Sequence, residues 1–357
     1  MNPDGKRILI IKPSSLGDVV HTLPVVHAIK RRHPSCHIGW IIQQTFVGIV
    51  SSDPAVDEII PISIPSTSDP QAQRGVMLQA AKATLRTMAQ LRKRFRLKPF
   101  DLVLDLHASL RSGLFAKSNP NGFRIGFADA KEFNTLFQNH CIVTDPEKPH
   151  AIDKNLCFAS YLHCDPLAED FNIVTDPKAR AAVRSFLTDE GIHPDDKIIY
   201  ANPSARWESK FWTIQGWARL ADMLIREAGV KVCFAGSPGD LPYINEITKM
   251  MLEKPTVAAG RLDLLGAVAL IEVSDAYVGV DSGPMHIAAF AGTPVVALFG
   301  PTDPAKVGPY GTGHRVIQHS DLDCLTCRKR TCEDHRCLDQ ITPEQVLAET
   351  LNVLAKT

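Results

Sequence analysis

The chain alternates short apolar runs, rich in β-branched residues, with longer stretches in which apolar positions recur at helical spacing. In the first half this pattern predicts strands at residues 7–12, 37–42, 58–61 and 102–106. It predicts helices at residues 18–32, 76–96 and 110–117. Regular alternation of strands and helices is typical of an α/β fold with parallel sheets.

A second alternation follows a looser stretch at residues 166–176 that contains Asp, Pro and Asn. It predicts strands at residues 197–201, 231–235, 256–258, 276–280 and 294–299. The intervening helices are predicted at residues 213–227, 242–252, 263–273 and 284–291. Two α/β halves in 357 residues predict two domains with a cleft between them. Ligands of such sheets bind beyond the carboxyl ends of the strands.

Composition narrows the class of protein. An apolar fraction of 45% and a charged fraction of 22% are those of a globular protein. The net charge of zero gives no overall attraction to nucleic acid. Neither a signal peptide nor an apolar run of about 18 residues is evident, and the odd cysteine count of nine favours a reducing cytosol.

The loop at residues 12–18 joins the first predicted strand to the first predicted helix. Such loops present backbone N–H groups and the positive end of a helix to polar ligands. Asp18 is interpreted either as a helix cap or as a general base at the cleft. Lys12 either keeps that carboxylate ionised or meets a phosphate, and Gly17 permits a tight turn. His21 lies one turn further on, where a lone histidine is more often structural.

A second loop, residues 202–210, follows the first strand of the second half. Ser204 offers a hydroxyl, while Arg206 and Lys210 offer positive charge. These groups suit a diphosphate, because charge-assisted hydrogen bonds to phosphate are strong. The alternative is a solvated basic loop without a ligand.

Two more loops end strands of the second half. Residues 236–240, which include Gly236 and Ser237, form a small-residue turn that lets a nucleotide ring approach the backbone. Ser282 and Gly283 expose amides at a predicted helix start, and Asp281 can accept from sugar hydroxyls. Neither a Walker loop nor a G-x-G-x-x-G fingerprint is present, which disfavours kinases and dehydrogenases.

Taken together, these loops resemble glycosyltransferase family 9, the lipopolysaccharide heptosyltransferases. The marks of the resemblance are Ser14-Ser15-Leu16-Gly17-Asp18-Val19 after the first strand, His21-Thr22-Leu23-Pro24, residues 202–212, Asp281-Ser282-Gly283 with His286, and residues 298–304. The resemblance covers nearly the whole chain. It implies the GT-B fold, in which two Rossmann-like domains face each other across a cleft. We therefore expect an acceptor domain at residues 1–170, a nucleotide-sugar domain at 178–340, and a final helix at 341–357 that packs back toward the first domain.

The resemblance also implies a reaction. Family members transfer heptose from ADP-L-glycero-β-D-manno-heptose to the Kdo/heptose inner core of lipopolysaccharide, with inversion and without a required metal or cofactor. The family's catalytic aspartate matches Asp18, and its phosphate-binding lysine matches Lys210. The donor residues expected here, in part by extension from chemistry, are Ser204, Arg206, Lys210, Gly236, Ser237, Asp281, Ser282, Gly283 and His286. The acceptor residues expected are Lys12, Ser14, Ser15, Gly17, His21, Arg111 and Arg124.

Residues 71–100 are strongly basic. They contain no acidic residue and eight cations, namely Arg74, Lys82, Arg86, Arg92, Lys93, Arg94, Arg96 and Lys98. Apolar residues recur between them at helical spacing, which suits either an anionic membrane surface or a packed helix with a cationic solvent face. With a lipid A-linked acceptor, we expect a cytoplasmic protein in peripheral contact with the inner membrane.

Four cysteines, Cys324, Cys327, Cys332 and Cys337, lie within fourteen residues. Their spacing is compatible with a structural zinc, although the second pair is not a C-x-x-C. Reduced thiols are the favoured interpretation, since the adjacent cations at 328–330 suit thiolates without any metal.

Two alternatives to the heptosyltransferase interpretation stay open. One is another GT-B enzyme with a different nucleotide sugar, such as a UDP-hexose transferase or a 2-epimerase. The other is a non-catalytic protein that binds a nucleotide sugar.

Overall fold

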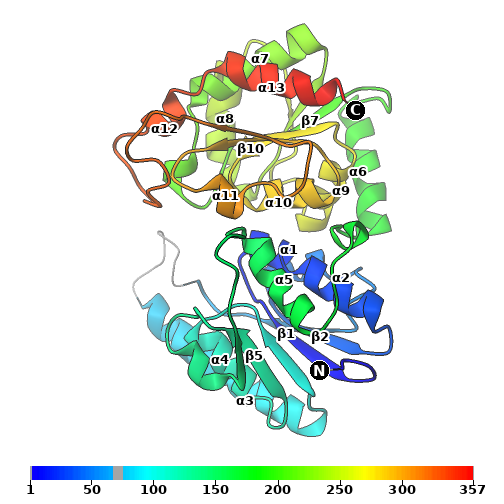
Figure 1. Cartoon of the computed structure of the whole chain (residues 1–357). Coiled ribbons are helices and arrows are strands. Elements are labelled where there is room, and N and C mark those ends of the chain that lie inside the picture. The colour runs from blue at the N-terminus through cyan, green and yellow to red at the C-terminus, as the bar shows by residue number, and fades with distance from the viewer. Residues whose placement is uncertain (1, 67–74, 357) are drawn as a thin grey trace. The chain divides into compact units, whose positions relative to one another are not determined.

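The structure is a computed structural model that describes residues 2–66 and 75–356. The chain divides into two compact units, Met1–Val174 and Thr175–Thr357. Each unit is built around one parallel sheet of six strands with helices packed against it, as Figure 1 shows. The predicted α/β class is confirmed.

The first unit has the strand order β3-β2-β1-β4-β5-β6. Its strands are β1 Arg7–Ile11, β2 His37–Gln43, β3 Glu58–Ile62, β4 Leu102–Asp105, β5 Phe123–Phe127 and β6 His140–Ile142. Its helices are α1 Leu16–Val20, α2 Leu23–Arg32, α3 Val76–Leu97, α4 Leu110–Lys117 and α5 Ala151–Tyr161, with 3₁₀ turns η1 Gln44–Ile49, η2 Asn134–Phe137 and η3 Ala168–Asp170. After β1, the strands β2 and β3 extend the sheet on one side of β1, and β4, β5 and β6 then extend it on the other side.

The second unit has the strand order β12-β11-β10-β7-β8-β9. Its strands are β7 Ile198–Asn202, β8 Lys231–Phe234, β9 Thr256–Val257, β10 Ala276–Val280, β11 Val295–Phe299 and β12 Arg315–Gln318. Its helices are α6 Pro177–Asp189, α7 Ile214–Ala228, α8 Leu241–Met250, α9 Leu264–Glu272, α10 Gly283–Phe290, α11 Pro304–Val307, α12 Arg336–Asp339 and α13 Pro343–Leu354, with 3₁₀ turns η4 Glu208–Lys210 and η5 Pro238–Asp240. Counted from β9, this order repeats that of the first unit, and it is the order of the doubly wound nucleotide-binding fold.

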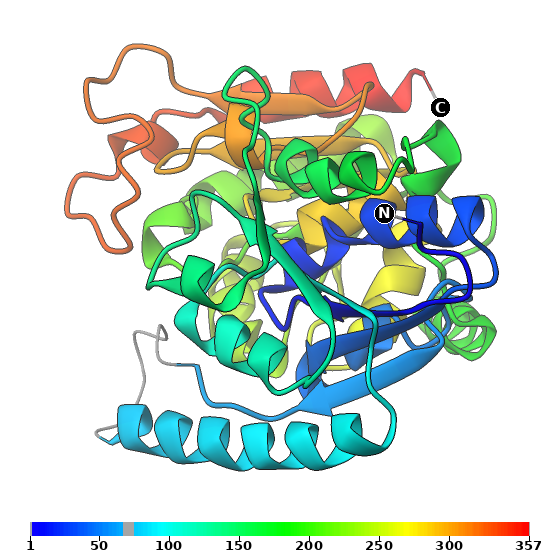
Figure 2. The same cartoon turned by 60° about the horizontal axis from the view of Figure 1, so that its bottom comes forward.

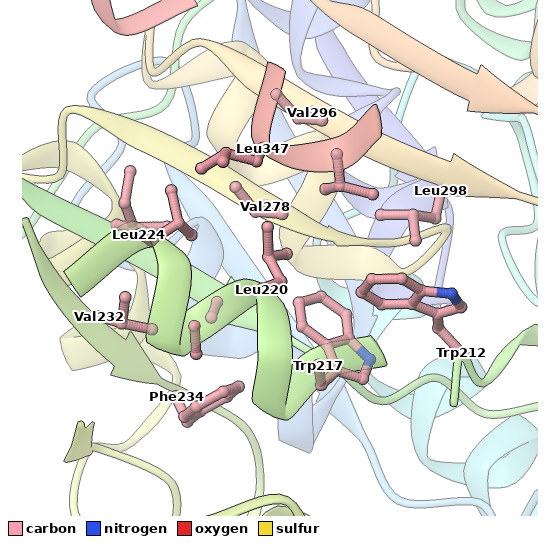
Figure 3. Close-up of a cluster of buried hydrophobic side chains, with 14 of the residues drawn as sticks. Trp212, Trp217, Leu220, Leu224, Val232, Phe234, Val278, Val296, Leu298 and Leu347 are labelled. Carbon is pink, nitrogen blue, oxygen red and sulfur yellow. The ribbon is translucent and has the colours of Figure 1, made fainter. Parts of the chain in front are cut away.

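The core of the second unit explains how its helices are held on the sheet. Trp212 and Trp217 meet edge to face at 5.3 Å, and they lie among apolar side chains of β8, β10 and β11 in Figure 3. The final helix α13 adds Leu347 to the same cluster, and the indole N–H of Trp212 donates to the Ile341 carbonyl just before that helix. Helix α13 is therefore packed in the core of the second unit. Its expected contact with the first domain stays a prediction.

The predicted elements are confirmed with one main difference. The helix expected at residues 18–32 is two helices, α1 and α2, with His21 and Thr22 between them. Pro24 explains the break, because it has no N–H to donate to the carbonyl four residues earlier. Strands β5, β6 and β12 and helices α5 and α6 were not predicted; the three strands lie at or near an edge of their sheet. No helix within the described residues combines the length and the apolar character that a membrane span requires.

Candidate functional site

In each unit the chain adds strands first on one side of its first strand and then on the other. The loops that follow the two central strands therefore lead in opposite directions, which leaves space between them. We call the carboxyl ends of β1 and β4 the first switch point, and those of β7 and β10 the second switch point. Ligands of doubly wound sheets bind at such points. Each switch point of this chain is bridged by a lysine: Lys12 after β1 and Lys210 after β7.

At the first switch point, Asp18 lies in the first turn of α1. Ser15 is the N-cap of this helix, and its backbone N–H and hydroxyl donate to Asp18 Oδ2 at 3.0 and 2.8 Å. Asp18 Oδ1 lies 3.3 Å from Lys12 Nζ, and the Asp18 side chain is 43% exposed. The carboxylate is thus fixed by the helix start while it stays open to solvent. In Asp18, Oδ2 therefore caps the start of the helix, while Oδ1 is free of the capping hydrogen bonds.

The surroundings of Asp18 keep it ionised. Desolvation alone would raise the pKa of the Asp18 carboxyl, but the Lys12 ammonium and the Ser15 hydrogen bonds outweigh it and hold that pKa far below the ordinary aspartate value. Lys12 is itself 10% exposed and donates to the Leu106 carbonyl at 2.8 Å. Lys12 therefore ties the loop after β4 to Asp18, and its contact with an acceptor stays a prediction.

The loop after β4 contains a residue that the sequence analysis did not single out, His107. Its backbone N–H donates to Asp105 Oδ1 at 3.1 Å, and the next residue, Ala108, has a left-handed φ of 59°. Burial and the nearby Lys12 cation lower the pKa of His107, so its imidazole is neutral at physiological pH. A neutral imidazole can both donate and accept hydrogen bonds, which suits a sugar hydroxyl. The sequence feature that could have identified His107 is its position shortly after the buried strand β4.

The fully buried Asp105 holds this loop in shape. Its Oδ2 accepts from Asn134 Nδ2 at 2.7 Å and from Gln138 Nε2 at 3.1 Å. Asn134 also donates to the Ser109 carbonyl at 2.7 Å, which joins the end of β4, the start of α4 and η2. A buried carboxylate needs such partners, so this network fixes the backbone that carries His107.

The other acceptor residues expected in the first unit differ in their surroundings. Ser14 is partly exposed, and Gly17 is buried within α1. His21 is 3% exposed, and its ring lies 5.8 Å from that of His150. Arg124 donates to the Phe137 and Gly122 carbonyls at 2.6 and 3.2 Å, so its guanidinium is used within the fold. Arg111 is partly exposed at the start of α4, two residues after its N-cap.

At the second switch point, Lys210 and Asp281 form a buried ion pair. Lys210 Nζ lies 2.6 Å from Asp281 Oδ2, and the two side chains are 15% and 6% exposed. The Thr302 hydroxyl after β11 donates to the same oxygen at 2.6 Å, and the Lys210 ammonium lies 4.8 Å from the centre of the Trp207 ring. Thr302 and Trp207 were not predicted as site residues. Together these groups fix a cation at the carboxyl end of the sheet.

A second set of hydrogen bonds places the start of α10. Ser282 is its N-cap, and the Ser282 hydroxyl accepts from Asn202 Nδ2 at 2.9 Å and lies 3.2 Å from the Tyr277 hydroxyl. Gly283 is the first residue of the helix, so its amide is among those without an intrahelical partner. His286 lies one turn further on and is 6% exposed. The helix start therefore presents backbone N–H groups, as an anion-binding site requires.

The remaining donor residues line two loops of the same unit. Ser204 is buried, and its carbonyl accepts from Asn202 Nδ2 at 2.9 Å, whereas Arg206 is exposed. The Ser237 N–H and hydroxyl donate to Asp240 Oδ2 at 2.7 and 2.6 Å. A side chain at Gly236 would meet Asp240 at 3.0 Å, which explains why glycine fits there. The structure brings Lys210, Asp281, Ser282 and Gly283 to one switch point.

The four cysteines at residues 324–337 are free thiols, as are the other five. Cys324 and Cys327 are exposed, while Cys337 lies against Gly300. Burial and the neighbouring sulfurs raise the pKa of Cys337 to about 11, so it is protonated at neutral pH. Across residues 2–66 and 75–356, His, Cys, Asp and Glu side chains form no group arranged to hold a metal ion. Reduced thiols and the zinc alternative both stay predictions.

Comparison with known proteins assigns this geometry to a family. The sequence model of "Glycosyltransferase family 9 (heptosyltransferase)" matches residues 88–337. The chain belongs to glycosyltransferase family 9. It is therefore a glycosyltransferase, and the binding-protein alternative is set aside.

Curated members of family 9 resemble nearly the whole chain. The lipopolysaccharide core heptosyltransferase OpsX of Haemophilus influenzae is 30% identical over 319 residues, which cover 87% of this chain and 84% of that protein. Lipopolysaccharide heptosyltransferase 1 of Pseudomonas aeruginosa is 28% identical over 366 residues, 96% of this chain and 94% of that protein.

Solved structures of family 9 enzymes share the fold. The glycosyltransferase family 9 protein of Veillonella parvula has a TM-score of 0.84 at 24% identity, covering 100% of this chain and 99% of that one. Escherichia coli ADP-heptose lipopolysaccharide heptosyltransferase II has a TM-score of 0.76 at 24% identity, covering 98% and 99%. These neighbours confirm the GT-B fold expected from the sequence.

Proposed function

We propose that this family 9 enzyme transfers heptose from ADP-L-glycero-β-D-manno-heptose to the Kdo/heptose inner core of lipopolysaccharide, with inversion at the anomeric carbon. Two relatives that match most of the chain are named as lipopolysaccharide heptosyltransferases. Heptosyltransferase WaaC of E. coli, a fold neighbour, has been solved with ADP and with ADP-2-deoxy-2-fluoro heptose. These names support the donor and the acceptor class.

The observation that carries the proposal is the ionised Asp18 carboxylate at the first switch point. Ser15 occupies Oδ2, whereas Oδ1 faces Lys12 at 3.3 Å in a side chain that is 43% exposed. In our proposal Asp18 removes the proton of the acceptor hydroxyl as that oxygen attacks the anomeric carbon. The attack comes from the side opposite ADP, so a single displacement inverts the centre. The acceptor then binds to the first unit, beside His107 and Arg111.

The second unit is proposed to bind the donor and to stabilise its departure. As the bond between heptose and diphosphate breaks, negative charge grows on the leaving phosphate. Lys210 donates to Asp281 Oδ2 at 2.6 Å and to the Asp281 carbonyl at 3.3 Å, which leaves its third N–H for that phosphate. The amide of Gly283 at the start of α10 adds a fixed dipole of the same sign. These groups supply the charge stabilisation themselves, so we propose that no metal or cofactor is required.

We also propose that the enzyme works in the cytoplasm. All nine cysteines are free thiols, as expected in a reducing compartment. The proposed acceptor is linked to lipid A, so the enzyme must reach a sugar that is anchored at the inner membrane. Peripheral contact with that membrane is therefore part of the proposal.

Two variants separate the proposed roles. Asp18→Asn keeps the shape of the side chain but removes the base, so we expect turnover to fall about 10²–10⁴-fold. ADP affinity, measured by calorimetry, should stay within about twofold because Asp18 lies in the other unit. Lys210→Ala should weaken both donor binding and turnover. Glu147→Gln, which neutralises an exposed carboxylate elsewhere in the first unit, is the matched control.

The outcome that contradicts the base assignment is turnover of Asp18→Asn within about tenfold of the unmodified enzyme. Equal ADP affinity of Lys210→Ala and the unmodified enzyme would contradict the donor assignment. Both measurements use the full chain, and circular dichroism of each variant confirms that the fold is retained.

A further inference from the structure

Helix α3 has one face that is fully explained by packing. Ala80, Thr84, Thr87, Leu91 and Phe95 are buried and recur at intervals of three to four residues along one line of the helix. Ala80, Leu91 and Phe95 belong to one hydrophobic cluster with apolar side chains of β1, β2 and β3. Figure 2 shows α3 lying along the sheet of the first unit as a single long helix of 22 residues. The rest of its surface faces away from the core.

That outward surface carries large apolar side chains. Leu78, Leu85 and Leu97 are 61%, 67% and 84% exposed, whereas Met77, five full turns before Phe95, starts the packed line of the helix. Leu78, Leu85 and Arg96 share one line because they are separated by about two and about three full helical turns. A surface hollow of ≈ 520 Å³ is lined only by residues of this helix, among them Leu85 and Leu97. Leu78, Leu85 and Leu97 therefore expose apolar surface that the packing of the first unit does not use.

The same surface carries only positive charge. Lys82, Arg86, Arg92, Lys93, Arg96 and Lys98 are exposed, and residues 75–100 contain no acidic side chain. Among the described residues, none of these six cations has an ion pair. Arg94 differs, because it is paired with Glu58 at 2.8 Å and belongs to the packed side. Arg74, the remaining cation of this basic stretch, lies outside the described residues. We call the exposed side chains of Leu78, Leu85 and Leu97 and these six cations the α3 outer face.

We propose that the α3 outer face binds the anionic surface of a phospholipid bilayer, with the helix parallel to the membrane plane. The proposal rests on the proposed function only in its biological purpose, which is to bring the enzyme to a lipid-linked acceptor.

Three arguments select this occupant. A helix that mixes exposed leucines with lysine and arginine side chains buries its apolar side chains at the headgroup boundary, while its cations meet anionic headgroups. Nucleic acid would use the cations but leaves Leu78, Leu85 and Leu97 without apolar partners. A second copy of the chain would bring six cations against six, so the same surface opposes self-association.

The test is binding of the full chain to vesicles. We expect it to co-sediment with phosphatidylcholine vesicles that contain about 30% phosphatidylglycerol, and to bind pure phosphatidylcholine at least tenfold more weakly. Binding should weaken as salt rises, because the exposed cations are screened. The triple variant Arg92→Gln, Lys93→Gln, Arg96→Gln should lose at least tenfold in binding. The variant Leu78→Ser, Leu85→Ser should also weaken binding, with the salt dependence retained.

A matched triple variant tests whether the effect belongs to this face. Lys178→Gln, Arg184→Gln, Lys254→Gln removes three exposed cations from the second unit and should bind vesicles as the unmodified chain does. If both triple variants lose vesicle binding equally, the proposal is overturned, because the binding then depends on the net charge of the chain and not on the α3 outer face. Unchanged binding of both α3 variants would overturn it too, as would binding to single-stranded RNA without binding to anionic vesicles.

Activity on two forms of one acceptor separates this proposal from the proposed function. We expect the α3 variants to retain transfer to a deacylated, water-soluble core acceptor and to lose it on the same acceptor embedded in anionic vesicles. If the unmodified enzyme transfers heptose to neither form yet binds the vesicles, the proposed function fails and the surface proposal stands. If it transfers to both forms but does not bind, the surface proposal alone fails.

Discussion

At the scale of single residues, Lys12 determines the protonation state of Asp18. The ammonium lies 3.3 Å from the carboxylate, and it is the strongest of the influences that lower the pKa of Asp18. A carboxylate with so low a pKa is always ionised at physiological pH, but it is a weak base in the free enzyme. An acceptor group that drew Lys12 away from Asp18 would strengthen the base at the moment it is needed.

This gives a prediction for the pH dependence of kcat/KM. In the unmodified enzyme Asp18 stays ionised as the pH falls through about 4, so its protonation causes no acidic limb there. In Lys12→Met the strongest lowering influence is removed while the Ser15 hydrogen bonds remain, so the pKa should rise toward the ordinary aspartate value and an acidic limb should appear near about pH 4. The shape of the profile is the readout, whatever the change in its height.

Lys148→Met, which removes an exposed cation elsewhere in the first unit, is the control and should keep the original profile. If Lys12→Met and the unmodified enzyme show the same acidic limb, Lys12 does not set the state of the base.

At the scale of elements, Glu58 joins four parts of the first unit. It lies on β3 and accepts from Arg7 of β1 at 2.7 Å, from His37 of β2 at 2.9 Å and from Arg94 of α3 at 2.8 Å. Burial would raise the pKa of Glu58, but these three partners lower it to about 2. A group with a lowered pKa stabilises the fold at pH values above its unfolded pKa, and that contribution is lost as the pH falls through the folded value.

We therefore expect Glu58→Gln to lower the free energy of unfolding of the first unit by about 1–3 kcal/mol at pH 7. The difference between the variant and the unmodified chain should shrink as the pH falls from about 4.5 toward 2. Urea denaturation followed by circular dichroism at several pH values measures both. Glu246→Gln, in an exposed pair with Lys249, should change stability by less than about 0.5 kcal/mol. If the difference in free energy of unfolding between Glu58→Gln and the unmodified chain is the same at all pH values, the lowered pKa of Glu58 does not contribute to stability.

The elements also show what local sequence can predict. Strong periodicity located most of the strands and helices within one or two residues, and α4 was predicted without error. The break between α1 and α2 was missed because apolar positions continue across it, although Pro24 marks it. Strand β6 was missed because three residues carry too little periodicity to be recognised.

At the scale of the whole molecule, the chain contains two sheets of one topology, each with a lysine across its switch point. The sequence analysis selected Asp18 and Lys210 because both follow predicted strands and match residues of the family's motifs, and their roles stay predictions. It did not predict His107, because its nearness to Asp18 depends on the pairing of β1 with β4, which brings Ile11 beside Asp105. Thr302 was included only within the motif at residues 298–304, because its partner Asp281 is 21 residues away and directly follows the neighbouring strand β10.

The most direct test of the central claim is transfer from ADP-heptose to Kdo₂-lipid A and to its mono-heptosylated form, side by side. The account predicts heptosylated product from at least one acceptor, with the opposite anomeric configuration to the donor, and its loss in Asp18→Asn. Product on the bare Kdo acceptor would identify the enzyme that adds the first heptose; product only on the heptosylated one would identify a later enzyme. No product on either acceptor, from an enzyme that binds ADP-heptose, would contradict the proposed function while leaving the family and the fold in place.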